Sequence, residues 1–213
     1  MANTHSNQFF NVKNLVTLAL LSALLVIMAF TPLGYLNIGA LAITFNAIPV
    51  AIGAIALGWK GGAVLGAVFG LTSFSQCFGS SPLGTLLFSI SPTMTFAQCV
   101  LPRVLMGICV GLIFSALSKT KLKKEFSFAV SGFFAAFLNT VFYMSSLMIL
   151  FSDSDFIQDK WQSIAPGKNV VLFVAAFVGT NAIVEAVSAT VITLGVAAAL
   201  YHARLIKSVK SAA

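Results

Sequence analysis

The sequence predicts an all-α membrane protein, a single domain over residues 1–213 with six transmembrane helices. The composition and the placement of charge support this. Hydrophobic residues make up 59% of the chain and charged residues 8%, against about 45–50% and about 25% in soluble domains, and mean hydropathy is +1.00. Among twelve basic and five acidic residues, only Arg103 and Glu185 fall inside the long apolar runs. We therefore expect a multi-pass protein of the cell membrane.

Each predicted helix corresponds to one apolar run. Runs of about 17–25 residues are long enough to cross a hydrocarbon core of about 30 Å. The runs lie at residues 14–34, 40–58, 61–75, 97–118, 126–150 and 170–201. The third run is short and the sixth is long, so tilt or protrusion is expected there. Residues 76–96 and 151–169 contain Gly, Pro and Ser and are expected to form outer loops.

The basic residues predict the orientation of the chain, because short loops rich in Lys and Arg stay in the cytoplasm. A cytoplasmic N-terminus places nine of the twelve basic residues on that side: Lys13, Lys60, Lys119, Lys121, Lys123, Lys124, Arg204, Lys207 and Lys210. An even number of crossings then returns the C-terminus to the cytoplasm. Lipid headgroups explain the net charge of +7 better than a nucleic-acid partner does.

The sequence lacks the usual signatures of catalysis. Both histidines, His5 and His202, lie in terminal segments, which leaves no histidine for a nucleophile relay or a zinc site inside the bilayer. Residues 53–60 read GAIALGWK and lack the Ser or Thr of a phosphate-binding loop. No CxxC spacing or metal-ligand cluster occurs among the cysteines, Cys77, Cys99 and Cys109. We expect neither an enzyme nor a bound cofactor or metal.

The two charges inside the apolar runs are the first candidates for a functional site, since a charge in a bilayer is costly without a partner. Arg103 follows Pro102 near the outer end of its predicted helix, where a guanidinium could bind a carboxylate with its fork of donors. It could instead snorkel to the headgroups or pair with Glu185. Glu185 lies deeper, has no second carboxylate and is interpreted as more structural, as a counter-charge.

Several polar side chains accompany Arg103 on the predicted helices. Asn139 and Tyr143 are four residues apart and share a helix face, and Asn181 and Glu185 repeat that spacing. The candidate substrate-binding residues are Arg103, Gln98, Asn139, Tyr143, Asn181 and Asn46. Each amide side chain alone could also form a structural hydrogen bond between helices. Together with Arg103 they predict a polar pocket that opens outward.

Two faces of small residues suggest close helix packing. Gly62, Gly66 and Gly70 recur every four residues and let another backbone approach. Ala19 and Ala23 repeat that spacing in the first run. Either face could pack within the chain or receive a partner protein.

Three segments carry a resemblance to a known family: FTPLGYLNIG at residues 30–39, IPVAIG at 48–53 and GGAVLGAVFGLTSF at 61–74. They resemble the substrate-binding S component of energy-coupling factor (ECF) vitamin transporters. Pro102 with Arg103 is a second point of similarity, and within the family the match is best to the pantothenate-specific members. The resemblance covers the first four predicted helices well and the rest mainly through topology.

The resemblance implies six helices with both termini in the cytoplasm. It also implies that Ala19 and Ala23 contact an EcfT-like transmembrane coupling subunit, and that two cytosolic ATPase subunits complete the transporter. In the family, the later helices and the outer loops bind the vitamin, which fits most of the candidate residues. Asn46 lies on the second predicted helix and departs from that pattern. Pantothenate, with one carboxylate, an amide and two hydroxyls, suits Arg103 and the neighbouring amides.

Other functions stay open at this level. The chain could be an S component for another vitamin. A self-sufficient secondary transporter would need ion-coupling groups and usually internal repeats, for which Glu185 alone is thin support. A structural membrane scaffold would bind no small molecule.

Overall fold

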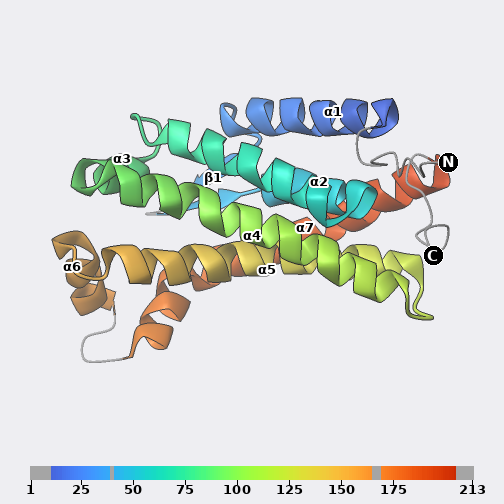
Figure 1. The fold of residues 1–213 in the computed structure, drawn as a ribbon. Helices are drawn as coiled ribbons and strands as arrows, with labels where there is room; N and C mark the ends of the chain where they lie inside the picture. Colours follow the sequence, from blue (N-terminus) through green and yellow to red (C-terminus); the bar gives the residue numbers. More distant parts are fainter. Residues whose placement is uncertain (1–10, 39–40, 165–168, 205–213) are drawn as a thin grey trace, which may run out of the picture.

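The computed structural model describes residues 11–38, 41–164 and 169–204, which form long helices and one short strand hairpin (Figure 1). In chain order the elements are α1 (Val12–Ala29), β1 (Tyr35–Ile38), β2 (Leu41–Thr44), α2 (Ala47–Gln76), α3 (Pro82–Ile90), α4 (Pro92–Ser118), α5 (Lys124–Phe151), α6 (Asp155–Ile164) and α7 (Val170–His202). Within these described residues, α1, α2, α4, α5 and the Asn181–His202 part of α7 are long and apolar enough to cross a membrane.

The second and third predicted helices form the two arms of α2. Gly58 breaks the helix with φ 74° and ψ −169°, values that suit a residue without a Cβ. The arms then fold back on each other, because a Cβ added at Gly53 would lie 2.0 Å from Leu65 Cδ1 and one at Gly62 would lie 3.1 Å from Ala54 Cβ. The predicted break between residues 58 and 61 is thus close to its observed position.

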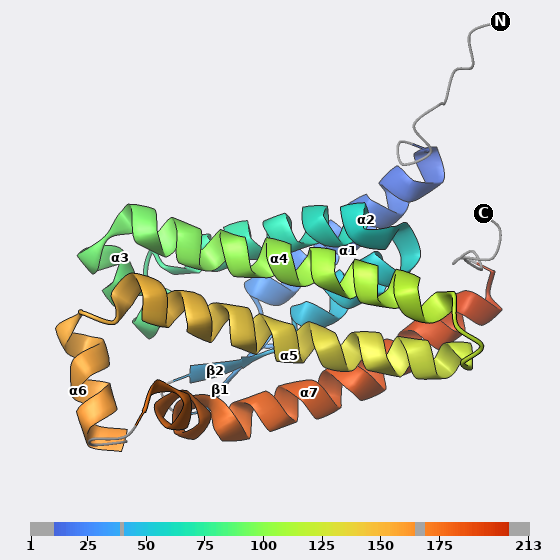
Figure 2. The ribbon, with the colours of Figure 1, turned by 60° about the horizontal axis from the view of Figure 1, so that its bottom comes forward.

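The predicted start of a helix at residue 40 was wrong. Leu41–Thr44 is strand β2, which pairs antiparallel with β1 in the register Tyr35 to Thr44. A two-stranded hairpin alone is marginally stable, and here β2 packs against α7 (Figure 2). The strands therefore take up the first part of the apolar run, and the first arm of α2 supplies only its remainder.

The glycine face of α2 packs inside the chain, against α4. A Cβ at Gly62 would lie 2.2 Å from the carbonyl oxygen of Gly107, and one at Gly66 would lie 2.3 Å from that of Arg103. A Cβ at Gly70 would lie 2.7 Å from Val100 Cα. All three contacts are with backbone atoms, so glycine brings the two helices together and fixes the position of Arg103.

Both predicted outer loops contain a short helix. Ser81 caps α3 with its hydroxyl on the N–H of Gly84, and Ser91 caps α4 in the same way, each just before a proline at the first helical position. The helix α4 thus begins five residues before its predicted start. The short helices α3 and α6 lie at the same end of the bundle (Figure 1).

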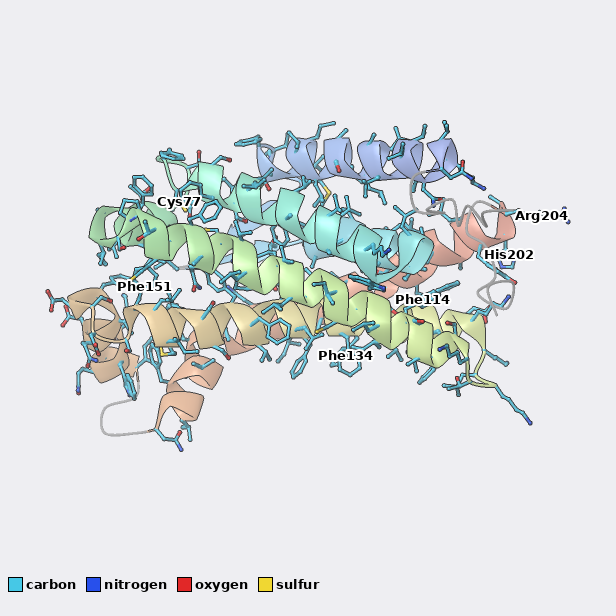
Figure 3. All side chains as sticks on the ribbon, viewed as in Figure 1. Cys77, Phe114, Phe134, Phe151, His202 and Arg204 are labelled. Atoms are coloured by element: carbon cyan, nitrogen blue, oxygen red, sulfur yellow. The ribbon has the colours of Figure 1, made fainter. Side chains whose placement is uncertain are left out.

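The opposite end gathers the start of α1, the turn at Gly58, the α4–α5 connection and the end of α7 (Figure 1). In Figure 3, Cys77 and Phe151 mark the end with α3 and α6, and His202 and Arg204 mark the opposite end. A buried core that includes Leu25, Val50 and Met106 joins α1, α2 and α4 between these ends.

Candidate functional site

A cavity of about 640 Å³ lies among α2, α3, α4, α5, α7 and the segment that follows α1. This volume is within the range of pockets for small ligands, about 300–1,000 Å³. Its lining includes the polar residues Thr44, Ser73, Gln76, Thr95, Arg103, Asn139, Thr140, Asn181 and Glu185. The predicted residues Arg103, Asn139, Tyr143 and Asn181 all line it.

Arg103 is 8% exposed and is held from two directions. Its Nη1 donates a hydrogen bond of 2.8 Å to the carbonyl oxygen of Gln98. Pro102 explains why this carbonyl is available: a proline inside a helix has no N–H, so the carbonyl four residues earlier loses its helical donor. The Pro–Arg pair in the sequence thus creates its own internal acceptor.

Two aromatic rings flank the guanidinium. Its Cζ lies 4.3 Å from the ring centroid of Tyr143 and 5.4 Å from that of Phe69, distances typical of cation–π contacts. Arg103 Nε is buried and has no hydrogen-bond partner among the described residues. Because buried donors are normally paired, this atom indicates capacity for an acceptor that the described part of the chain does not supply.

Gln98 lies behind the cavity wall and does not line the cavity. It is fully buried, and its Nε2 donates a hydrogen bond of 2.9 Å to the carbonyl oxygen of Tyr143. The backbone carbonyl oxygen of Gln98 accepts the hydrogen bond from Arg103 Nη1. Gln98 therefore joins α4 to α5 and positions both the guanidinium and the ring beside it.

The two cavity asparagines come from different helices. Asn139 on α5 is 5% exposed, and its Oδ1 is buried without a hydrogen-bond partner in the described ranges. Asn181 on α7 is half-buried. Asn139 lies one turn from Tyr143, as the four-residue spacing predicted, so the cavity receives an amide and a ring from the same face of α5.

Asn46 lies outside the cavity lining, at the junction between β2 and α2. It is fully buried, and both polar atoms of its side chain lack hydrogen-bond partners within residues 11–38, 41–164 and 169–204. Its backbone N–H donates to the Thr44 hydroxyl over 3.3 Å. Asn46 is thus a buried residue at the start of α2 that the cavity lining does not include.

With this geometry in place, comparison with known proteins identifies the family. Residues 13–197 match the family described as "ECF transporter, substrate-specific component". The chain belongs to this family. It is accordingly a multi-pass membrane protein and a transport component, as predicted from the sequence.

Two relatives of this ECF component are named for one vitamin. The "Pantothenic acid transporter PanT" of Lactococcus lactis subsp. cremoris is 26% identical over 166 residues, which is 74% of this chain and 76% of the relative. The "Pantothenate transporter PanT" of Leuconostoc mesenteroides subsp. mesenteroides is 28% identical over 202 residues, 92% of this chain and 93% of the relative.

The cavity of the ECF component also includes Glu185, which was not among the predicted substrate-binding residues. Interpreted from the sequence as structural, it lines the cavity and is 7% exposed. Its Oε1 accepts a 2.7 Å hydrogen bond from the N–H of Thr44, and no ion pair joins it to Arg103, the other charged residue of the described lining. The four-residue spacing from Asn181 was the available signal, because it places both side chains on one face of α7.

A pair of cysteines in the cavity wall was also missed. Cys77 at the end of α2 and Cys99 on α4 both line the cavity, and their Sγ atoms are 3.8 Å apart. The two cysteines are 22 residues apart in the sequence, so no local spacing could predict that they are neighbours.

The small-residue face of α1, formed by Ala19 and Ala23, is exposed to solvent or lipid within the described residues. Ala19 and Ala23 are both exposed, one turn apart. Only Leu25 and Ala29 of this helix are buried, and its main neighbour is α2. The helix runs along one side of the bundle (Figure 1).

Proposed function

We propose that this ECF substrate-specific component binds pantothenate in the cavity around Arg103. The observation that carries the proposal is a buried arginine in the wall of a ligand-sized cavity, held by Gln98 and Tyr143 but with an unpaired Nε. A guanidinium in this state suits a carboxylate. The names of the two relatives supply the vitamin.

The roles of the other residues follow from their placement. The carboxylate of pantothenate binds Arg103, while Asn139 and Asn181 satisfy amide and hydroxyl groups. Tyr143 stacks on the guanidinium and packs against the ligand. Gln98 acts as a positioning residue, and Asn46 supports the strand–helix junction. A ligand that lacks a matching group leaves a buried partner unpaired, at about 1–3 kcal/mol.

The chain crosses the membrane six times in this proposal, with both termini in the cytoplasm. The strand hairpin and the first arm of α2 make up the second crossing, and the second arm makes the third. Lys13, Lys60, the lysines between α4 and α5, and Arg204 all belong to the end of the bundle where α1 begins and α7 ends. The cavity is lined by α3 at the opposite, outer end.

Energy for uptake comes from partner subunits. The exposed Ala19 and Ala23 offer a shallow face on which an EcfT-like transmembrane subunit packs, and two cytosolic ATPase subunits complete the complex. The loaded chain then reorients against the coupling subunit. The support for this arrangement is family membership together with the unpartnered small-residue face of α1.

A thermal-shift panel of vitamins on the purified chain tests the substrate. A ligand present at 100 times its Kd stabilises the folded state by about 2.7 kcal/mol, so pantothenate is expected to raise the melting temperature by several degrees. Arg103→Ala should show no such rise. Stabilisation by another vitamin, with none by pantothenate, would overturn the assignment.

A further inference from the structure

The cavity carries a carboxylate as well as a guanidinium, and neither neutralises the other directly. Arg103 is held by the carbonyl of Gln98 at 2.8 Å, and Glu185 by the N–H of Thr44 at 2.7 Å. They are 8% and 7% exposed, respectively. Both side chains line the cavity, so both can contact a molecule that enters it.

Glu185 has unused hydrogen-bond acceptor positions that face the cavity. Its two oxygens offer about four acceptor positions, and Thr44 fills one of them. The side chain lies one turn after Asn181 on the cavity face of α7. A hydroxyl group entering the cavity here would complete a partly occupied acceptor.

We infer that Glu185 is the subsite that recognises the hydroxyl groups of the substrate. The inference rests on the proposed function and deepens it, since it defines the class of molecule selected. The cavity takes a monoanion whose carboxylate binds Arg103 and whose hydroxyl donors bind Glu185. A second carboxylate at the hydroxyl end would place two carboxyl groups together in one buried site, where they cannot readily both ionise, and would be rejected.

Pantothenate has this arrangement. Its β-alanine end carries the carboxylate and its pantoyl end carries two hydroxyls. The hydroxyl end then lies against α7 and strand β2, because Glu185 is bonded to Thr44. The strand hairpin thereby gains a link to the ligand through a single carboxylate.

Four ligands distinguish the contribution of Arg103 from that of Glu185. They are pantothenate, an N-acyl-β-alanine of equal length without hydroxyls, the alcohol analogue panthenol, and N-succinyl-β-alanine, which has a carboxylate at the hydroxyl end. Equilibrium binding is measured on the purified chain. Wild type should prefer pantothenate to the deoxy analogue by about 10- to 100-fold, as expected for hydrogen bonds to a charged group.

Glu185→Gln should reduce that preference to about threefold while leaving the preference for pantothenate over panthenol, which depends on Arg103. It should also bind N-succinyl-β-alanine more tightly than wild type, a gain that misfolding does not produce. Glu125→Gln, which removes an exposed carboxylate at the start of α5, is the matched control and should match wild type throughout.

An unchanged hydroxyl preference in Glu185→Gln, with no gain for N-succinyl-β-alanine, would overturn the inference and leave the proposed function intact. Equal affinity of wild type for pantothenate and its deoxy analogue would do the same. Failure of the folded wild-type chain to bind pantothenate would overturn both.

Discussion

Replacing Gly66 by alanine tests whether the contact between α2 and α4 fixes the position of Arg103. The added Cβ would lie 2.3 Å from the carbonyl oxygen of Arg103, 2.9 Å from its carbonyl carbon and 3.0 Å from Val104 Cα. All of these are backbone atoms that cannot rotate aside. The helices must therefore separate by about 1 Å to restore van der Waals contact.

The expected effects of Gly66→Ala are on both stability and binding. Overpacking of this kind costs about 1–3 kcal/mol, which lowers the melting temperature by roughly 2–12 °C in a domain of this size. The shift moves the guanidinium against Phe69 and the rest of the cavity wall. Pantothenate affinity should fall at least about tenfold, the loss of one charge-assisted hydrogen bond.

Melting temperature and equilibrium binding of radiolabelled pantothenate, both in detergent, measure these effects. Gly195→Ala is the matched control, because a Cβ at Gly195 of α7 meets nothing within 4 Å. That variant should bind as wild type does and gain up to about 1 kcal/mol in stability. Wild-type melting and affinity in Gly66→Ala would refute the close contact and its role in placing Arg103.

Three further predictions concern the cavity wall and α1. Tyr143→Phe should keep pantothenate affinity within a few-fold, because the ring 4.3 Å from the guanidinium is retained, whereas Tyr143→Leu should lose about 0.5–2 kcal/mol of binding in the same assay. Mild oxidation should join Cys77 to Cys99, whose Sγ atoms are 3.8 Å apart, and thiol counting by mass spectrometry should then show two fewer free thiols; three free thiols would contradict the geometry. Ala19→Trp combined with Ala23→Trp should keep vitamin binding and lose co-purification with the coupling subunit, and normal co-purification would exclude α1 as the contact.

The sequence predicted the long helices well because apolar run length is a direct requirement of the bilayer. The strand hairpin was not predicted from the sequence. Residues 40–58 are mostly apolar and show no amphipathic periodicity, so the run fits a single helix as well as it fits a strand followed by a helix. The pairing of Tyr35 with Thr44 depends on packing against α7, which no local pattern reveals. The short helices α3 and α6 lay inside segments identified only as loops.

The predicted site residues that line the cavity are mainly those singled out by their charge or by their helical spacing. Arg103 stood out because it is a charge in an apolar run, and Asn139 with Tyr143 because they share a face. Gln98 and Asn46 were grouped with them on polarity alone, and the cavity lining includes neither. The sequence could not show the hydrogen bond of Glu185, because its partner, the N–H of Thr44, lies 141 residues away in the chain.

The most direct test of the account is pantothenate binding to the purified wild-type chain and to Arg103→Ala, measured with radiolabelled ligand after both proteins are shown to be folded. We predict saturable binding by wild type and a loss of affinity of at least about tenfold in the variant, because the carboxylate loses its charge-assisted partner. Unchanged affinity in Arg103→Ala would contradict the central role of this guanidinium.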